Sequence, residues 1–181
     1  ADGLAIARLL KIKGIDVSVF LTEQIAESKN QTKSYQLQKD ICKRYGVLFS
    51  DDITMCNDYD LIIDAVFGIG LSRGISGAYE KIITEINAAD AYRIAVDIPS
   101  GISADDGSVL GCAIKADYTI TFGFFKVGQF LWPATDYCGE VILAHMGISY
   151  ESFLDKKPHL AFYEKDDLSL LPEREQHSNK G

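Results

Sequence analysis

The sequence predicts an α/β protein built around a mostly parallel β-sheet. Two short apolar runs, residues 59–67 and 94–96, show no apolar–polar alternation, which is typical of strands buried on both faces of a parallel sheet. Between them, residues 78–89 have the apolar spacing of a helix. Strand, helix and strand in this order form a βαβ unit, whose crossover is nearly always right-handed. The chain of 181 residues is long enough for one such domain with a substantial core.

The N-terminal part predicts a helix, a strand and a second helix. Residues 1–13 carry apolar side chains at helical spacing, and Gly14 follows directly. Residues 17–22 are apolar and β-branched enough for a strand. Residues 23–30 are polar, and residues 32–45 return to helical spacing before Gly46.

The part after residue 96 predicts further strands separated by long loops. Residues 103–111 form a polar loop, and residues 117–125 form a strand in which Thr119, Thr121 and Gly123 alternate with apolar side chains. Residues 126–139 predict a long functional loop or a broken helix, residues 140–146 a short strand, and residues 160–163 an additional edge strand. We assign residues 1–165 to one domain and the polar residues 166–181 to a linker.

Composition excludes several classes of function. With 18 Lys and Arg against 26 Asp and Glu, the net charge is −8, and no basic cluster is present, so a general electrostatic grip on nucleic acid or an anionic membrane is not expected. The four cysteines and three histidines are scattered, which argues against a structural zinc site. Free thiols and the absence of an export signal or a long apolar run favour the cytoplasm. Because the sequence opens on Ala1 without a methionine, we expect an upstream segment.

Asp97 is the first candidate for chemistry. It follows the predicted strand 94–96 directly and precedes Pro99, Ser100 and Gly101. In open α/β sheets, ligands bind outside the carboxyl ends of the strands, so a carboxylate at this position faces a candidate site. The alternative is that Asp97 only caps a turn, since Asp, Pro, Ser and Gly are ordinary loop residues.

A glycine-rich loop between the strand 59–67 and the following helix is the second candidate. Its backbone N–H groups would approach an anion at a helix N-terminus, and its arginine would add a charged donor to phosphate. The pattern misses the dinucleotide fingerprint by one residue and does not follow the first strand, which argues against an ordinary NAD-dependent dehydrogenase and leaves a plain tight turn as the alternative. The loop consists of Gly68, Ile69, Gly70, Leu71, Ser72, Arg73 and Gly74.

Two further charged residues stand out. Asp64 lies inside an apolar strand, where a carboxylate is costly unless it is hydrogen-bonded, paired or bound to a cation. Because no histidine or cysteine accompanies it, such a cation would be a hard ion with oxygen ligands, and a backbone N–H partner is the alternative. Lys126 follows the strand 117–125 and would reach the same face as Asp97 if the sheet is parallel there; a solvated surface lysine is its alternative.

Four motifs stand out along the chain: DGLAIARLL at 2–10, DLIIDAVFGIGLSRG at 60–74, VDIPSGISADDG at 96–107 with its AD-T-TFG-FK-G continuation to 128, and DYCGEV at 136–141. Together they resemble the motifs of the NAD(P)H-hydrate epimerase family, also called the YjeF N-terminal domain. They run in family order over nearly the whole chain, to about Gly147.

The resemblance implies a Rossmann-like three-layer sandwich, a homodimer, and epimerisation of R- and S-NADHX and NADPHX, the hydrated forms of NADH and NADPH. It makes Asp97 the catalytic carboxylate, and it makes residues 68–74, together with Lys126 and Asp2, the substrate-binding residues. Asp64 and Ser100 would be ligands of a potassium ion.

The sequence departs from the family pattern at its start. Ala1 stands where the N-N-G-G-D-G loop has its second glycine, and the asparagines that precede it in the family are not in this sequence. Residues 171–181, LPEREQHSNKG, resemble the start of an ADP- or ATP-dependent NAD(P)H-hydrate dehydratase domain. We therefore expect a bifunctional repair enzyme; the alternative from another class is a non-catalytic nucleotide-binding or scaffold module with the same fold.

Overall fold

The computed structural model describes residues 1–22, 32–153, 160–161, 163 and 165–170. The chain divides into two compact units, Ala1–Met146 and Gly147–Gly181. In the second unit the described residues form two short 3-10 helices, η4 (Tyr150–Phe153) and η5 (Lys165–Leu170). No helix in the described ranges is long and apolar enough to cross a membrane. Every strand among the described residues lies in the first unit, as does the candidate site.

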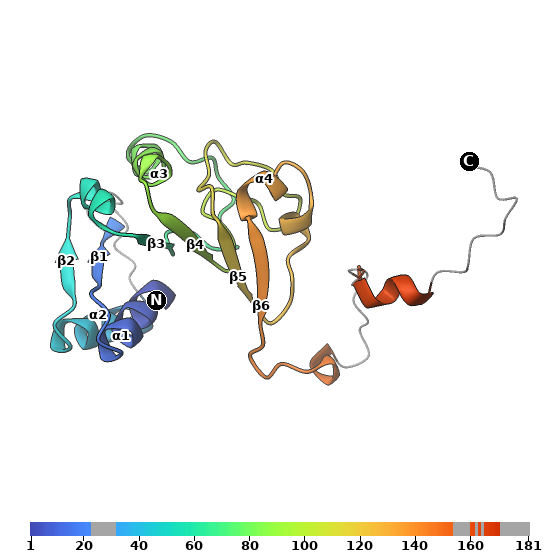
Figure 1. The fold of residues 1–181 in the computed structure, drawn as a ribbon, viewed down its shortest axis with the longest axis horizontal. Helices are drawn as coiled ribbons and strands as arrows, with labels where there is room; N and C mark the ends of the chain where they lie inside the picture. The colour runs from blue at the N-terminus through green and yellow to red at the C-terminus, as the bar shows by residue number, and fades with distance from the viewer. Residues whose placement is uncertain (23–31, 154–159, 162, 164, 171–181) are drawn as a thin grey trace, which may run out of the picture. The chain divides into compact units, whose positions relative to one another are not determined.

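The strands of the first unit form two parallel groups (Figure 1). One group pairs β1 (Ser18–Phe20) with β2 (Leu48–Ser50). The other has the order β3-β4-β5-β6, and each neighbouring pair is parallel. Its strands are β3 (Leu61–Asp64), β4 (Tyr92–Val96), β5 (Tyr118–Phe122) and β6 (Glu140–Ala144). The predicted parallel sheet is confirmed.

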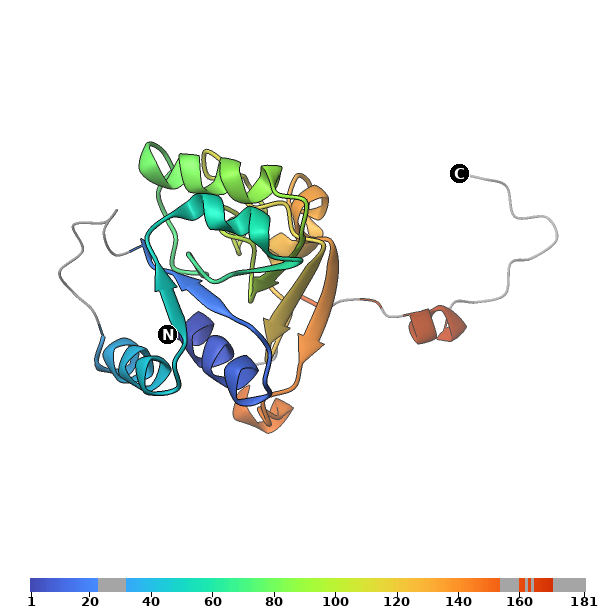
Figure 2. The ribbon, with the colours of Figure 1, turned by 60° about the vertical axis from the view of Figure 1, so that its left-hand side comes forward.

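The helices cover the strands on two sides. Figure 2 shows α3 (Ala78–Ala88) and the 3-10 helix η2 (Ile53–Asp58) on one side, with α1 (Asp2–Ile12) and α2 (Lys33–Arg44) on the other. This arrangement confirms the predicted three layers. The N-terminus of α2 is capped by Thr32, whose hydroxyl oxygen accepts a hydrogen bond from Tyr35 N at 3.2 Å.

Apolar side chains fill the spaces between the layers. Under α3, a cluster of isoleucines is almost completely buried, and it consists of Ile75, Ile82, Ile83, Ile86 and Ile114. A second cluster, Leu4, Ala7, Cys42 and Val47, joins α1 to α2. The helix α3 therefore buries the apolar face that its sequence spacing predicts. The helices α1 and α2 bury theirs only in part, since Leu9 and Leu37 are 49% and 59% exposed.

Some elements differ from the sequence prediction. The strand β2 and the helix η2 were not predicted, because each is short and lacks a clear apolar period. The edge strand predicted at 160–163 is wrong for Leu160, Ala161 and Tyr163, which are not in a strand. Residues 126–139 contain two short helices, η3 (Val127–Phe130) and α4 (Thr135–Cys138), as the broken-helix prediction states. The polar residues 23–30 and the tail 171–181 lie outside the described residues.

Candidate active site

Asp97 lies one residue beyond β4 in an unusual backbone conformation. Its φ is 71°, and it is the one described non-glycine residue with a positive φ. Ile98 N donates to Val96 O at 2.9 Å, which closes a γ-turn centred on Asp97. A second bond, from Asp97 N to Ile120 O at 2.8 Å, ties this turn to β5. A classic γ-turn, in which the central residue has a positive φ, is rare and strained. Such strain at the end of a strand indicates a candidate functional position.

The Asp97 carboxylate is held by β5 and by the segment that follows it. Its Oδ1 atom accepts hydrogen bonds from Thr121 Oγ1 and Phe122 N, both at 3.1 Å, and forms an ion pair with Lys126 Nζ. The Lys126 and Asp97 side chains remain 17% and 21% exposed. Among the described residues no hydrogen bond reaches Oδ2, so the carboxylate presents one unengaged oxygen.

The parallel sheet brings Lys126 to Asp97, as predicted. Besides its ion pair, Lys126 Nζ donates to Thr121 Oγ1 at 2.8 Å and to Phe122 O at 3.1 Å. These contacts fix the ammonium group at the carboxyl ends of β4 and β5. They rule out the alternative of a freely solvated lysine.

Gln129 joins the backbones of Asp97 and Lys126. Its side chain is 1% exposed; Nε2 donates to Asp97 O at 2.8 Å, and Oε1 accepts from Lys126 N at 2.9 Å. The sequence analysis missed both Gln129 and Thr121. A signal for Gln129 is present, because an amide between apolar neighbours must find partners when it is buried, which is the argument that singled out Asp64.

Asp64 and Ser100 form a second polar cluster, between the ends of β3 and β4. Asp64 is 2% exposed; its Oδ2 accepts from Ser100 N at 2.7 Å, and its Oδ1 from Ser100 Oγ at 2.6 Å and Val66 N at 3.2 Å. Burial raises the pKa of the Asp64 carboxyl above its ordinary value, and the hydrogen bonds from Ser100 and Val66 oppose that rise. The expected backbone partners of Asp64 are therefore present.

The same cluster has the donor chemistry of a hard-cation site. Ser100 Oγ also accepts from Phe67 N at 2.8 Å and lies 3.3 Å from Phe67 O. A carboxylate, a hydroxyl and a carbonyl oxygen thus meet at one buried point, and oxygen ligands suit alkali and alkaline-earth cations. Within the described ranges, no group of three or more His, Cys, Asp or Glu gathers. The residues present fit a hard cation better than a transition metal.

The glycine-rich loop 68–74 begins next to this cluster, one residue after Phe67. A hydrogen bond from Leu71 N to Gly68 O at 3.2 Å makes a turn at its start. That turn does not need glycine, because Gly68, Gly70 and Gly74 all lie outside the left-handed region and an added Cβ would meet nothing within 4 Å. The loop is open, with Ile69 61% exposed. Its glycines leave free surface beside the Asp64 and Ser100 cluster.

Asp2 is exposed at the first residue of α1. At the next residue, Gly3, an added Cβ would lie 2.8 Å from Ala65 Cβ, so the start of α1 packs against the end of β3. Among the described residues no hydrogen bond joins Asp2 to Asp97 or Asp64. Its predicted contact with substrate stays a prediction.

The geometry thus places two polar clusters at the carboxyl ends of three neighbouring parallel strands. In comparisons with known proteins, residues 1–128 match the family described as YjeF-related protein N-terminus, which covers well over half of the chain. The chain belongs to the YjeF N-terminal family.

Relatives of this YjeF-family chain agree with that assignment. A protein of Limosilactobacillus fermentum named NAD(P)H-hydrate epimerase is 45% identical over 143 residues, covering 79% of this chain and 67% of the relative. A Levilactobacillus brevis protein of the same name is 40% identical over 147 residues, covering 81% of this chain and 67% of the relative. The bifunctional NAD(P)H-hydrate repair enzyme Nnr of Thermofilum pendens is 36% identical over 181 residues, covering 96% of this chain and 34% of that protein.

A solved structure supports the YjeF fold. The crystal structure of yeast ynu0 matches with a TM-score of 0.67 at 18% identity, covering 91% of this chain and 70% of the yeast chain. The likeness confirms the predicted Rossmann-like α/β fold. This chain spans about two thirds of the length of the two bacterial relatives and about one third of the Thermofilum pendens protein.

Proposed function

We propose that this YjeF-family protein interconverts R- and S-NADHX, and R- and S-NADPHX, by epimerising the hydroxyl group on C6 of the hydrated nicotinamide ring. One observation carries the proposal: the Asp97 carboxylate stands at the carboxyl end of β4, paired with Lys126, with one oxygen unengaged among the described residues. The relatives at 40% and 45% identity are named NAD(P)H-hydrate epimerase.

The reaction requires one group that gives and takes back a proton. The lone pair of the ring nitrogen forms a C=N bond as the C6–O bond breaks, and protonated Asp97 gives its proton to the departing hydroxyl, which leaves as water. Water then adds to the other face of C6, and the Asp97 carboxylate takes the proton. The Lys126 ammonium stabilises the carboxylate between these two steps.

We assign the substrate phosphates to the loop 68–74. Its open glycines let backbone N–H groups approach an anion, and Arg73 is exposed in the same loop. Phe67 N donates a hydrogen bond to Ser100 Oγ at 2.8 Å. The residue before the loop is therefore tied to a residue that lies three positions after Asp97. Asp2, at the start of α1, would complete the substrate-binding residues.

We propose potassium as the ion bound at Asp64 and Ser100. When bound, it would supply a fixed positive charge that orders the loop and the substrate phosphate. In the complete protein, replacing choline chloride by potassium chloride at constant ionic strength should raise the midpoint of thermal unfolding, and Asp64→Asn should abolish that rise. Sodium or lithium in place of potassium should also lower the epimerase rate. Equal midpoints in all four salts would rule out a specific ion.

The rival function is a nucleotide-binding or scaffold module that has the fold without the reaction. The ion pair of Asp97 with Lys126 favours the enzyme, since a scaffold has no need for a strained carboxylate at the site. Calorimetry on the complete protein with NADHX, NADPHX, NAD and ADP separates the two. An epimerase should prefer the hydrated nucleotides, whereas equal affinity for all four would support the scaffold.

We further propose that the complete protein is bifunctional and carries an ADP- or ATP-dependent S-NAD(P)HX dehydratase domain. The similarity to the bifunctional Thermofilum pendens protein, which extends over 96% of this chain, supports this. A dehydratase that accepts one epimer gains from an epimerase on the same chain, because both epimers are then repaired. Reading the encoding frame beyond Gly181 tests the proposal, and a stop codon there would overturn it.

We propose a cytoplasmic homodimer. The described cysteines Cys42, Cys56, Cys112 and Cys138 are all free thiols, which suits a reducing compartment. Two neighbouring apolar side chains, Leu131 and Trp132, are 43% and 78% exposed and offer a surface for a second copy. Analytical ultracentrifugation of the complete protein should give the mass of two chains, and Trp132→Glu should shift it to one.

A further inference from the structure

The hydrogen bonds to the Asp97 carboxylate all end on one of its two oxygens. Oδ1 accepts from Thr121 Oγ1 and from Phe122 N, both at 3.1 Å, and it is paired with the Lys126 ammonium. Oδ2 receives no hydrogen bond from any part of the chain that the structure describes. The two oxygens are therefore chemically different before any substrate arrives.

The neighbours of Oδ1 leave no place for a proton on that atom. The backbone N–H of Phe122 and the ammonium group of Lys126 are donors only, because neither has a lone pair that could accept. The hydroxyl of Thr121 accepts from Lys126 Nζ at 2.8 Å, and Asp97 Oδ1 is the one acceptor that its own hydrogen reaches within the described ranges. A hydrogen on Oδ1 would thus point at three other hydrogens.

We propose that the proton transferred by Asp97 resides on Oδ2, and that Thr121 is a positioning residue that fixes the carboxyl group in this orientation. The inference rests on the proposed epimerase function. In the first step the Oδ2–H and C6–O bonds break, and the hydroxyl leaves as water while the ring nitrogen forms the C=N bond. In the second step water adds to C6, the C=N electrons return to the nitrogen, and Oδ2 takes the proton of the water.

This arrangement requires no movement of the protein between the two steps. When Asp97 is protonated, Oδ1 is the carbonyl oxygen of the acid and accepts from the same three donors that it has in the carboxylate. Donors that are already aimed before the proton moves cost no reorganisation during the reaction. The asymmetry of the hydrogen bonds therefore suits a group that gives and takes back one proton.

Thr121 is the side chain best placed to hold this geometry. It is fully buried in β5, and its hydroxyl contacts both members of the ion pair, donating to Asp97 and accepting from Lys126. Its β-branched side chain has few rotamers, whereas the lysine has a flexible four-carbon stem. The threonine should therefore align the lysine as well as the carboxylate.

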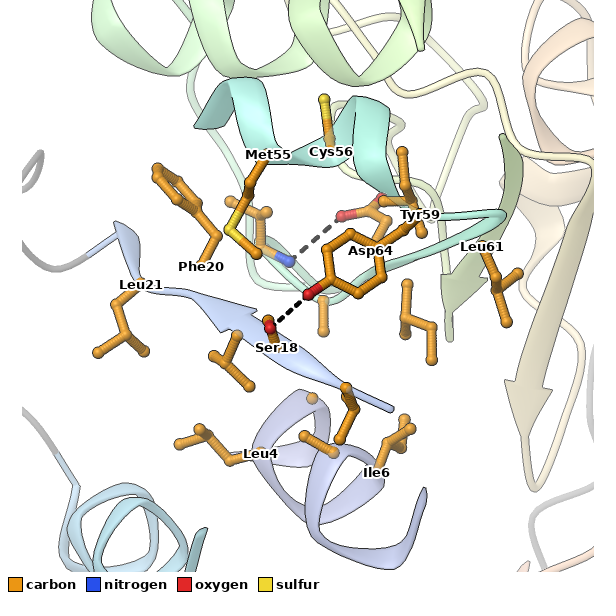
Figure 3. A pocket seen from close by; sticks show the side chains of 18 of the residues that line it. Leu4, Ile6, Ser18, Phe20, Leu21, Met55, Cys56, Tyr59, Leu61 and Asp64 are labelled. Carbon is orange, nitrogen blue, oxygen red and sulfur yellow. Dashed lines mark hydrogen bonds between the residues drawn. The ribbon is translucent and has the colours of Figure 1, made fainter. Parts of the chain in front are cut away.

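Asp64 is the contrasting carboxylate at the end of the neighbouring strand. Its Oδ2 accepts from Ser100 N at 2.7 Å, and its Oδ1 accepts from Ser100 Oγ at 2.6 Å and from Val66 N at 3.2 Å, so both oxygens are engaged. Figure 3 shows Asp64 among the mostly apolar side chains that line the pocket next to β1. Asp97, which keeps one oxygen available, is the better proton carrier of the two.

The chain offers a matched control for Thr121 on the same strand. Thr119 lies two residues earlier, so both side chains point to the same face of β5, and both are fully buried. The hydroxyl of Thr119 donates to Cys138 O at 2.6 Å and does not contact the ion pair. Thr119→Val and Thr121→Val thus remove the same atom from similar surroundings, and only the second change reaches Asp97.

Kinetics of the complete protein with purified R-NADHX test the role of Thr121. Relative to Thr119→Val, we expect Thr121→Val to lower kcat at least about 10-fold while KM stays within about twofold, and Thr121→Ser to recover most of the loss. Equal kcat in the two valine variants, or no recovery with serine, would overturn the inference alone. A parent protein that does not convert R-NADHX would overturn the proposed function itself.

A crystal structure of Asp97→Asn with bound NADHX tests the assignment of the proton, even if Thr121→Val does not fold. The three donors should hold the amide oxygen in the place of Oδ1, which puts the amide nitrogen in the place of Oδ2. We expect this nitrogen within hydrogen-bond distance of the C6 hydroxyl of the substrate. A C6 hydroxyl on the Oδ1 side would overturn the inference, and one remote from residue 97 would overturn the proposed function as well.

Discussion

At the scale of single residues, Asp97 is defined by its backbone as much as by its carboxylate. A positive φ of 71° is tolerated by aspartate better than by most residues. Five neighbours hold Asp97: Ile120 through the backbone, Thr121, Phe122 and Lys126 through the carboxylate, and Gln129 through the carbonyl. Proximity to β5 and η3 therefore fixes where the carboxylate points. The strained backbone thus lies at the residue to which we assign the proton transfer.

Gln129→Leu should lower both stability and rate. The variant keeps the volume but leaves Asp97 O and Lys126 N without their partner, and each unsatisfied buried group costs about 1–3 kcal/mol. We expect a loss of about 2–4 kcal/mol in the free energy of unfolding in urea, together with a lower kcat because Asp97 and Lys126 lose their alignment.

The matched control is Gln36→Leu on the exposed face of α2, which should change the free energy of unfolding by less than about 0.5 kcal/mol. If Gln129→Leu lowered stability while kcat stayed at the parent value, Gln129 would hold the fold without positioning the catalytic pair.

Gly70→Ala should affect substrate binding by the loop 68–74 without affecting the stability of the fold. An added Cβ meets nothing within 4 Å, and φ is outside the left-handed region, so the unfolding midpoint should stay within about 1 °C of the parent. If substrate phosphates approach this loop closely, the methyl group should raise KM several-fold while kcat changes little.

Gly128→Ala is the contrasting variant, since its Cβ would lie 2.1 Å from Ser103 O and must distort the packing. It should lower the unfolding midpoint. An unchanged KM in Gly70→Ala would show that the loop does not contact the substrate.

At the scale of elements, the residues at the ends of strands could be predicted from the sequence, whereas the hydrogen bonds between elements could not. Asp97 and Lys126 could be found because each follows an apolar run that the sequence marks as a buried strand. Gln129 and Thr121 gain their roles from hydrogen bonds across β4, β5 and η3, which no local pattern encodes. β2 was missed for a related reason: its three residues form no run, and pairing with β1 defines it.

The carboxylate of Asp106, in the loop 103–111, should make the stability of the protein depend on pH. Side-chain hydrogen bonding to Ser103, with bonds from Ser108 N at 3.0 Å and Ser108 Oγ at 2.8 Å, lowers the pKa of Asp106 from 3.8 to about 2. A depressed carboxyl pKa contributes stability above the unfolded-state pKa, and that contribution is lost as the pH falls through the folded-state pKa.

The midpoint of the parent should therefore exceed that of Asp106→Asn at pH 5, and the difference should shrink between about pH 4 and pH 2. Thermal unfolding of both proteins at several pH values measures it. A difference that is constant across this range would show that the Asp106 carboxylate does not hold the loop.

At the scale of the whole molecule, the described strands form two parallel groups, β1-β2 and β3-β4-β5-β6. The sequence predicted the layers and the parallel direction of the strands. It did not predict the interruption of the sheet, because the apolar runs of β1 and β3 look the same with or without a strand between them.

The central claim, that Asp97 moves the proton in an epimerase, is tested by one comparison in the complete protein. Asp97→Asn keeps the shape and an oxygen that accepts from Phe122 N and Thr121 Oγ1, but it removes the proton-carrying group. Purified R-NADHX is added to each protein, and its conversion to S-NADHX is followed by chromatography. The account predicts that the variant remains folded and converts R-NADHX at least about 100-fold more slowly. Conversion at the parent rate would contradict it.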